Sequence, residues 1–457
     1  MPMSIQSVNP HEPSDVIVEF EPDGQQGVQA AVEAAKEAFP DWSVLPVPER
    51  SQALVDTAAE LERRSDEVVE LLVREVGKPL TEARAEVERA VAIFRYHSQI
   101  ALAADGETYP SSDGRSWLLA RRHPIGVCGL ITPWNFPVAI QAWKTAPALV
   151  CGNTVVLKPA PESPAVARLL YEITARHLPD DVFRLVLGDR ETGEPLVDHP
   201  DVGAVSFTGS VEAGHIVAAK AAGRGAKAQC EMGGQNPSIV LDDADLGSSA
   251  ETIASAAMAF AGQKCTATSR VIVQAPVYDE FKDRLVSTIE NMELFEPSKE
   301  SCEVGPLVRR SSLETALSAM DEAGGRVLTG GAAPDVEGFY LEPSVIEIDD
   351  PANPLAQEEV FGPVAALLKA GDASDAIAVG NGVRYGLSAA LFTTDLGRAM
   401  SLAPRIEAGI IRINAPTTGA EYYAPFGGSK ASSIGPKEQG FAARDFYTET
   451  RTILASS

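Results

Sequence analysis

A cysteine and a glutamate, each in a short polar segment, are the residues of this chain best suited to covalent chemistry. Cys265 lies in Gly-Gln-Lys-Cys-Thr-Ala-Thr-Ser-Arg, and Glu231 begins the earlier segment Glu-Met-Gly-Gly-Gln-Asn-Pro. A thiolate adds to an aldehyde carbon and holds it covalently, and the acyl group must then be released by water that a carboxylate has deprotonated. We therefore expect Cys265 to attack the carbon and Glu231 to activate the water.

Each residue alone has a simpler interpretation, since an isolated cysteine is more often a small buried hydrophobe than a nucleophile. A glutamate beside two glycines is usually part of a turn. Further segments favour the catalytic interpretation because they occur with these two in a fixed order. They are Thr132-Pro133-Trp134-Asn135-Phe136-Pro137, Leu157-Lys158-Pro159, the turn from Gly209 to Gly214, and Glu358-Glu359-Val360-Phe361-Gly362-Pro363.

Together and in this order the six segments resemble the NAD(P)-dependent aldehyde dehydrogenase family, over a range from about residue 30 to the C-terminus. The resemblance implies an α/β protein with the aldehyde dehydrogenase fold: a Rossmann-like cofactor domain, an α/β catalytic domain, and a small β unit that bridges protomers. We expect residues 1–103 and 125–232 to form the dinucleotide-binding domain, 233–430 the catalytic domain, and 104–124 with 431–457 the bridging unit.

The periodicity of the sequence points to the same fold class. Apolar residues recur at helical spacing between Gly27 and Ala103, which predicts several amphipathic helices. Short apolar runs then alternate with helical segments from Gly126 to Phe207, and a second such series follows Glu231. This alternation is typical of a parallel sheet with crossover helices, whose ligands bind at the carboxyl ends of the strands.

A cofactor site is predicted at the strand, turn and helix start from Val205 to Gly214. Glycines there let the backbone approach a pyrophosphate, whose charge is favoured at a helix N-terminus, although an ordinary turn explains the same pattern. The resemblance implies NAD or NADP, with Lys158 at the adenosine ribose, Glu359 at the nicotinamide ribose and Phe361 at the nicotinamide. The expected cofactor-binding residues are Thr132, Pro133, Trp134, Lys158, Pro161, Glu162, Gly209, Ser210, Gly214, Glu359 and Phe361.

The choice between NAD and NADP stays open at Pro161. Many NAD-specific relatives carry, three residues after the equivalent of Lys158, a glutamate that binds the ribose 2′-hydroxyl. Pro161 stands there in this chain, which reduces the repulsion of a 2′-phosphate and permits NADP. Glu162 lies directly beside it and keeps NAD open.

The resemblance also implies an oxyanion site made by the Asn135 amide and the Cys265 backbone N–H. Lys144 is either a charge on a helix surface or a member of a proton relay. Cys302 is not expected to act, because the acidic residues around it would raise its thiol pKa. Cys230 is expected to be a packed strand residue.

The segments around Cys265 and Asn135, with Pro416 to Gly428, are similar to those of α-ketoglutarate semialdehyde (2,5-dioxopentanoate) dehydrogenases within the family. Succinate semialdehyde and aromatic or aliphatic aldehydes would use the same catalytic residues, and no arginine stands out for an anionic substrate. A coenzyme-A-acylating relative would lack the base Glu231. An inactive structural member would not need Cys265 and Asn135.

Composition excludes several other classes of protein. A chain of 457 residues predicts two or three domains, and its five cysteines show no CxxC spacing, so neither disulfides nor a metal site is expected. The longest apolar runs are shorter than the roughly 20 residues that span a bilayer, and the N-terminus lacks the basic and apolar regions of a signal peptide. We expect a cytoplasmic homodimer or homotetramer that acts on a small aldehyde.

The acidic surface argues against two kinds of partner. A formal charge of −26 repels nucleic acid and anionic membranes. Such an acidic excess is typical of proteins adapted to high salt, where screening shortens the reach of like-charge repulsion. An ordinary acidic protein is the alternative.

Overall fold

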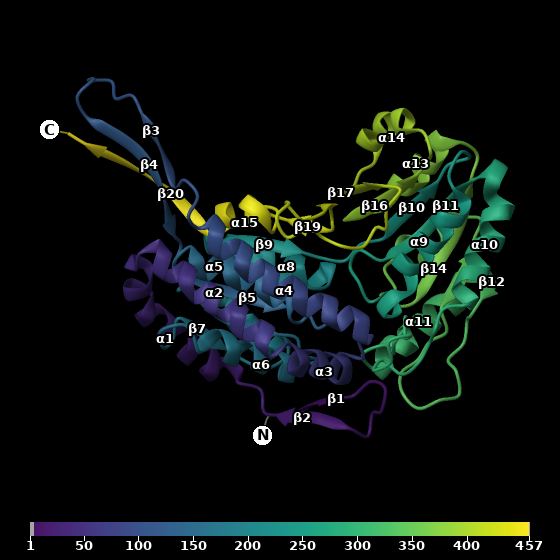
Figure 1. The fold of residues 1–457 in the computed structure, drawn as a ribbon, viewed down its shortest axis with the longest axis horizontal. Helices are drawn as coiled ribbons and strands as arrows, with labels where there is room; N and C mark the ends of the chain where they lie inside the picture. The colour runs from purple at the N-terminus through teal and green to yellow at the C-terminus, as the bar shows by residue number, and fades with distance from the viewer. Residues whose placement is uncertain (1–3, 457) are drawn as a thin grey trace.

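Two large α/β sheets and one projecting β unit make up the protein in the computed structural model, which describes residues 4–456 (Figure 1). The first sheet has six strands in the order β19-β9-β8-β5-β6-β7, and all except β19 run parallel. Its strands are β5 (Val127–Thr132), β6 (Thr154–Pro159), β7 (Phe183–Leu185), β8 (Val202–Thr208), β9 (Lys227–Glu231) and β19 (Ser433–Ile434).

Helices cover both faces of this sheet because its central strands are apolar on both sides. In β5, Cys128 and Leu130 belong to one hydrophobic core, whereas Val127 and Ile131 belong to the other. The first core is completed by α2 to α6, and the second by α1, α7 and α8. These helices are α1 (Gly24–Val44), α2 (Val47–Arg63), α3 (Ser65–Val76), α4 (Leu80–Ile100), α5 (Ala139–Val150), α6 (Pro164–Ala175), α7 (Arg190–Asp198) and α8 (Val211–Gly223).

The second sheet has seven strands in the order β12-β13-β14-β11-β10-β16-β17, of which only β12 is antiparallel to its neighbour. Its strands are β10 (Asn236–Val240), β11 (Thr268–Gln274), β12 (Arg326–Thr329), β13 (Ser344–Glu347), β14 (Val364–Ala370), β16 (Ser388–Phe392) and β17 (Ile410–Ile413). Its helices are α9 (Leu246–Met258), α10 (Tyr278–Glu290), α11 (Arg310–Ala323), α12 (Pro354–Gln357), α13 (Ala373–Asn381) and α14 (Leu396–Leu402).

Three antiparallel strands project from the body of the protein and carry the C-terminus near their tip (Figure 1). They are β3 (Gly106–Tyr109), β4 (Trp117–Pro124) and β20 (Thr448–Ala455), and α15 (Gly440–Phe446) leads into the last of them. Two strand pairs lie outside the three main sheets: β1 (Ile5–Val8) with β2 (Val16–Phe20), and β15 (Tyr385–Gly386) with β18 (Ser429–Lys430). Three short 3-10 turns, η1 (Ala259–Gly262), η2 (Ala275–Val277) and η3 (Ala403–Arg405), complete the chain.

The end of the chain corrects one predicted boundary. Residues 431–457 were assigned wholly to the bridging unit, but β19 pairs with β9, Ser433 opposite Glu231 and Ile434 opposite Cys230. The pairing covers a strand that would otherwise leave its backbone groups open at the sheet edge. The tail therefore contributes to the first sheet before it enters the projecting strands.

Within residues 4–456, no helix is both long and apolar enough to cross a membrane. The same part of the chain contains no group of three or more His, Cys, Asp or Glu side chains placed to hold a metal ion.

Candidate active site

A cavity of about 460 Å³ lies where the carboxyl ends of β5, β8 and β9 meet loops of the second sheet. Both halves of the protein contribute to its walls, which is the arrangement expected of a ligand site in a parallel α/β fold. Eight predicted site residues line it: Pro133, Trp134, Asn135, Gly209, Ser210, Cys265, Glu359 and Phe361. The six that do not are Thr132, Lys158, Pro161, Glu162, Gly214 and Glu231.

Cys265 lies in a loop whose conformation is fixed by an unusual backbone turn and by one buried side chain. At Phe260 the backbone φ is 55°, and the next two residues are also left-handed, a conformation that costs free energy for residues other than glycine. The fully buried Gln263 amide donates to the carbonyls of Phe260 and Pro306. Helix α9 therefore ends at Met258, and the left-handed turn after it leads to Cys265, which borders the cavity.

Asn135 follows the carboxyl end of β5 and is bound directly to this cysteine loop. Its Nδ2 donates to the Gln263 carbonyl (2.9 Å), and its Oδ1 accepts from the Phe136 backbone N–H (3.1 Å). The Asn135 carbonyl accepts from Lys78 Nζ (2.7 Å), which fixes the backbone as well. Because an amide nitrogen carries two protons, one of them stays available to an oxygen atom in the cavity.

The environment of Cys265 favours the neutral thiol. Burial raises the pKa of this thiol to about 12, and the carboxylates of Glu359 and Glu231 add to the increase. The side chain nevertheless keeps some exposed surface and borders the cavity. A thiolate must therefore form when the charges around the sulfur change, because the protein alone disfavours it.

Glu231 ends β9 and is turned toward the C-terminal segment. Its side chain is buried, and its Oε2 accepts from Ser433 Oγ and from the Gly428 backbone N–H (3.3 Å). Its Oε1 is buried without a partner, and a Cβ atom on Gly427 would lie only 2.3 Å from it. Burial raises the pKa of this carboxyl to about 8, and the charge of Glu438 adds to the shift. The charge of Glu231 thus acts on the Cys265 thiol, but the Glu231 side chain does not line the cavity.

Glu359 and Phe361 line the cavity from the loop after α12. Glu359 Oε1 accepts from the Gly234 backbone N–H (3.0 Å), and a Cβ atom on Gly233 would lie 1.9 Å from Oε2. Glycine at that position is therefore required for the carboxylate to fit. Phe361 has a φ of 55° and meets the Trp134 ring edge to face, with centroids 5.7 Å apart. Burial raises the pKa of the Glu359 carboxyl to about 7.

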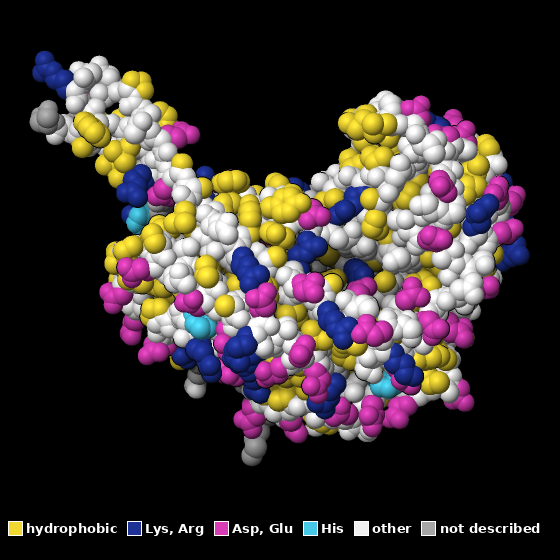
Figure 2. Space-filling model, in the orientation of Figure 1, with side chains coloured by type: hydrophobic (Ala, Val, Ile, Leu, Met, Phe, Trp, Pro, Cys, Tyr) yellow, Lys and Arg dark blue, Asp and Glu magenta, His cyan; other side chains and the backbone are white. Residues whose placement is uncertain are grey.

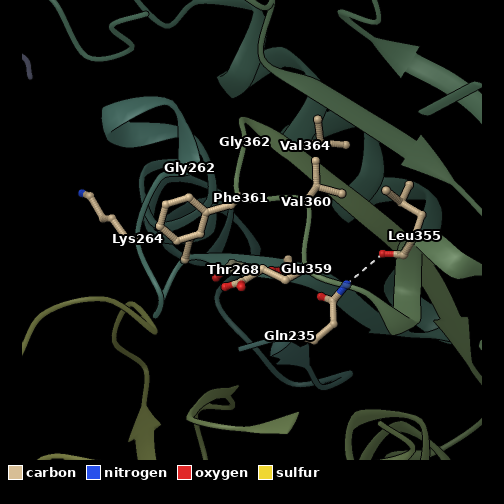
Figure 3. A pocket seen from close by; sticks show the side chains of 12 residues that line it. Gln235, Gly262, Lys264, Thr268, Leu355, Glu359, Val360, Phe361, Gly362 and Val364 are labelled. Atoms are coloured by element: carbon tan, nitrogen blue, oxygen red, sulfur yellow. Dashed lines mark hydrogen bonds between the residues drawn. The ribbon is translucent and has the colours of Figure 1, made fainter. Parts of the chain in front are cut away.

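A small pocket beside the cavity shares the Glu359–Phe361 segment with it (Figure 3). Gln235 Nε2 donates to the carbonyls of Leu355 (2.9 Å) and Glu358 (2.7 Å), which ties α12 and the residue before this segment to the start of β10. The Lys264 side chain extends away from the group in Figure 3 and pairs with Glu82 of α4 (2.7 Å). The charge next to Cys265 in the sequence is therefore engaged elsewhere.

The turn after β8 has the features of a pyrophosphate site. Ser210 is the N-cap of α8 and accepts from the Ala213 N–H (3.3 Å), so the helix N-terminus opens toward the cavity. The hydroxyls of Thr208 and Thr132 are buried and have no partner in the protein, as expected of groups that a ligand satisfies. Gly214 does not reach the cavity: a Cβ atom there would lie 2.3 Å from Met232 Sδ, so this glycine serves helix packing.

Lys158 lies near the carboxyl end of β6, and Pro161 and Glu162 follow that strand. Lys158 Nζ donates to the carbonyls of Pro159 and Gly188, both at 2.7 Å, and burial lowers its pKa to about 8. Pro161 and Glu162 form the turn into α6. Glu162 itself is paired with an arginine that lines the cavity.

Lys144 is not a charge on a helix surface. Its side chain is buried, donates to Ser206 Oγ (2.8 Å), and forms an ion pair with the equally buried Glu438. The sequence singled out neither partner, because only the packing of α5 against β8 and the tail brings Lys144 to Ser206 and Glu438. Cys302 is buried and its thiol pKa is raised to about 12, mainly by burial, while Cys230 is a buried residue of β9.

In comparison with known proteins, the sequence profile of the aldehyde dehydrogenase family matches residues 2–453. The chain belongs to the aldehyde dehydrogenase family. An α-ketoglutaric semialdehyde dehydrogenase of Bacillus subtilis (strain 168) is 42% identical to this aldehyde dehydrogenase, over 98% of this chain and 93% of the relative. An α-ketoglutarate semialdehyde dehydrogenase of Haloferax volcanii is 40% identical, over 98% and 95% of the two chains.

Solved structures show the same fold as this aldehyde dehydrogenase. A putative aldehyde dehydrogenase from Burkholderia cenocepacia superimposes with a TM-score of 0.96 at 37% identity, covering 99% of this chain and 94% of that one. PnpE, solved in complex with nicotinamide adenine dinucleotide, gives a TM-score of 0.96 at 35% identity with the same coverage. The predictions of the family and of the fold class are therefore confirmed.

Proposed function

We propose that this aldehyde dehydrogenase oxidises 2,5-dioxopentanoate (α-ketoglutarate semialdehyde) to 2-oxoglutarate with NAD or NADP, through a thioester on Cys265. The observation that carries the reaction type is the shared cavity of Cys265, Asn135, Glu359 and Phe361. The choice of substrate is based on two relatives named for this substrate, which are 42% and 40% identical over nearly the whole chain. PnpE, a relative solved with nicotinamide adenine dinucleotide, supports the choice of cofactor.

Cys265 and Asn135 perform the first half of the reaction. The Cys265 thiol loses its proton to water, its sulfur forms a bond to the aldehyde carbon, and the electrons of the carbonyl π bond pass to the oxygen, which becomes an oxyanion. The free Nδ2 proton of Asn135 and the Cys265 backbone N–H hold this oxyanion, since both groups border the same cavity. The nicotinamide ring, when bound, supplies the acceptor for the hydride that the substrate carbon loses. The carbon is then held as a thioester.

Glu231 performs the second half by removing a proton from water. The water oxygen bonds to the thioester carbon, the carbon–sulfur bond breaks, and the carboxylic acid leaves; the proton that Glu231 took from water then returns to the sulfur and restores the thiol. Because Glu231 is bound to Ser433 and Gly428, its side chain must rotate toward Cys265 for this step. The raised pKa of Glu231, about 8, suits a base that accepts a proton near neutral pH.

The residues around the cavity fit a dinucleotide. The N-terminus of α8, with its Ser210 cap, would hold the pyrophosphate, and the unpartnered hydroxyls of Thr208 and Thr132 would gain partners. We assign Glu359 to the nicotinamide ribose and Lys158 to the adenosine ribose. Pro133, Trp134, Gly209 and Phe361 would complete the contacts, with Pro161 and Glu162 beside the adenosine ribose and Gly214 supporting the helix.

A steady-state screen tests the proposal. We expect kcat/KM for 2,5-dioxopentanoate to exceed that for succinate semialdehyde, benzaldehyde and propanal, measured with NAD and with NADP. A higher kcat/KM for any of the other three aldehydes would overturn the proposed substrate. Product analysis with added coenzyme A separates hydrolysis from acyl transfer, and formation of an acyl-coenzyme A would remove the role of Glu231.

We also propose that the projecting strands join two copies of the chain into a homodimer or a dimer of dimers. These strands carry exposed apolar side chains, among them Trp117 (74% exposed) and Leu454 (60%). Figure 2 shows apolar side chains on this unit, whereas acidic side chains are spread over much of the body. In this proposal residues 104–124 and the end of the tail form the bridge, between a cofactor domain up to residue 232 and a catalytic domain from 233 to 430. Light scattering after gel filtration that returned a monomer mass would refute it.

A further inference from the structure

An ion pair joins the two halves of the protein at the edge of the cavity. Arg309 directly precedes α11 on the catalytic side, and Glu162 lies in the turn between β6 and α6 on the cofactor side. Arg309 Nη1 lies 2.6 Å from Glu162 Oε1, and the two side chains are 58% and 16% exposed. Arg309 also lines the cavity together with Gly209 and Ser210. Its guanidinium is therefore within reach of a ligand that extends from the α8 N-terminus toward β6.

The charges around this turn are few and specific. Glu162 is the only carboxylate of the turn between β6 and α6, and Arg309 already neutralises it. Glu162 and Asp189 both favour the charged form of Lys158, whose ammonium group donates to two backbone carbonyls. Lys158 is thus held in place, whereas Arg309, more than half exposed, is the cation of this edge that can exchange its partner.

In dinucleotide-binding folds the residues after the second strand of the first β-α-β unit meet the adenosine ribose. A carboxylate there binds the 2′-hydroxyl of NAD, whereas a nearby arginine accommodates the 2′-phosphate of NADP. The β5-α5-β6 unit ends at this turn. A guanidinium binds phosphate through two parallel hydrogen bonds, and an ion pair with such exposure contributes little stability, so the exchange of a carboxylate for a phosphate is favourable.

We infer that Arg309 selects the coenzyme: it leaves Glu162 to bind the 2′-phosphate of NADP, and it stays paired with Glu162 when NAD is bound. The inference rests on the proposed function, because it assumes that the cavity holds a nicotinamide dinucleotide. A residue of the catalytic half would then discriminate between the two coenzymes. Because Arg309 also forms the ion pair between the two halves, binding of NADP would change the contact between them.

Coenzyme binding without any aldehyde tests the inference. The dissociation constants of NADPH and NADH are measured by fluorescence titration for the wild-type protein, Arg309→Gln and Glu162→Gln. We expect Arg309→Gln to weaken NADPH binding by about tenfold or more, as for the loss of charge-assisted hydrogen bonds, and to change NADH binding by less than about twofold. Glu162→Gln should tighten NADPH binding, because it removes the competing carboxylate.

Arg310→Gln is the matched control, since Arg310 is the next residue, does not line the cavity and lies over the Phe339 ring instead. It should leave both dissociation constants unchanged. Equal losses for NADPH and NADH in Arg309→Gln, no loss at all, or a wild-type protein that does not bind NADPH would each overturn the inference. Thermal unfolding of each variant checks the fold. Because no aldehyde is present, a failure of the proposed substrate leaves these results unaffected, and a failure here leaves the substrate screen unaffected.

Discussion

Replacing Ser433 with alanine should move the pH dependence of turnover to higher pH. Ser433 Oγ donates to Glu231 Oε2, and this hydrogen bond lowers the pKa of a carboxyl that burial raises to about 8. The base must be ionised to accept a proton from water. Turnover limited by thioester hydrolysis therefore rises with pH through the pKa of Glu231, and the loss of a group that stabilises the carboxylate raises that pKa further.

The magnitude follows from the buried position of the pair. A hydrogen bond to a charged group contributes about 1.5 to 3 kcal/mol, and one pKa unit corresponds to about 1.4 kcal/mol. Glu231 is only 2% exposed, so water does not replace the lost donor. The pKa in Ser433→Ala should rise by about 1 to 2 units, and kcat near pH 8 should fall by roughly 5- to 50-fold.

Profiles of kcat against pH, with single-turnover measurements of thioester hydrolysis, provide the assay. Ser433→Thr keeps a hydroxyl and should retain a profile close to that of the wild type. Ser429→Ala is a control on the same segment, because Ser429 Oγ bonds to the Gly386 carbonyl and not to Glu231. An unchanged rising limb of the pH profile in Ser433→Ala, with hydrolysis rate-limiting, would refute the assignment of Glu231 as the base.

Three further outcomes are expected. Cys265→Ala should abolish the burst of NAD(P)H on adding aldehyde and leave coenzyme binding, measured by fluorescence titration, unchanged, whereas Cys302→Ala should keep the burst. Activity in Cys265→Ala would mean that another residue is the nucleophile. Gly233→Ala should weaken NADH binding by about tenfold, because the new Cβ atom would lie 1.9 Å from Glu359 Oε2 and must displace it; an unchanged dissociation constant would contradict the role of Glu359. The net charge of −26 predicts that the midpoint of denaturant unfolding rises as KCl increases from about 0.1 M, owing to screening; a flat response would favour an ordinary acidic protein.

The sequence predicts the parts of the site that lie next to strand ends. Asn135 follows β5, and Gly209 with Ser210 follows β8, so the topology of a parallel sheet brings them to one edge without any knowledge of packing. Cys265 and Glu359 required the family motifs, because their loops come from the second sheet. All five of these residues line one cavity in the structure.

The contacts that adjust the chemistry could not be predicted, because tertiary packing alone creates them. Ser433 and Glu231 are 202 positions apart, and Arg309 and Glu162 are 147 apart. No local pattern marks such a pair, since a serine in the tail and an arginine before a helix are ordinary surface residues by composition. The left-handed backbone at Phe260 could not be predicted either, because phenylalanine and the alanine after it are residue types that rarely adopt this conformation.

The turn before Cys265 has a thermodynamic consequence for every catalytic cycle. Orienting a reactive sulfur toward an electrophile costs entropy. If the sulfur becomes oriented only when the substrate arrives, this cost raises the activation free energy and slows the reaction. Here the unfavourable φ values of Phe260 and its neighbour are imposed when the chain folds, by the packing and hydrogen bonds of the surrounding core. The protein is less stable for it, but in the proposed mechanism the position of the Cys265 sulfur is already set when an aldehyde arrives.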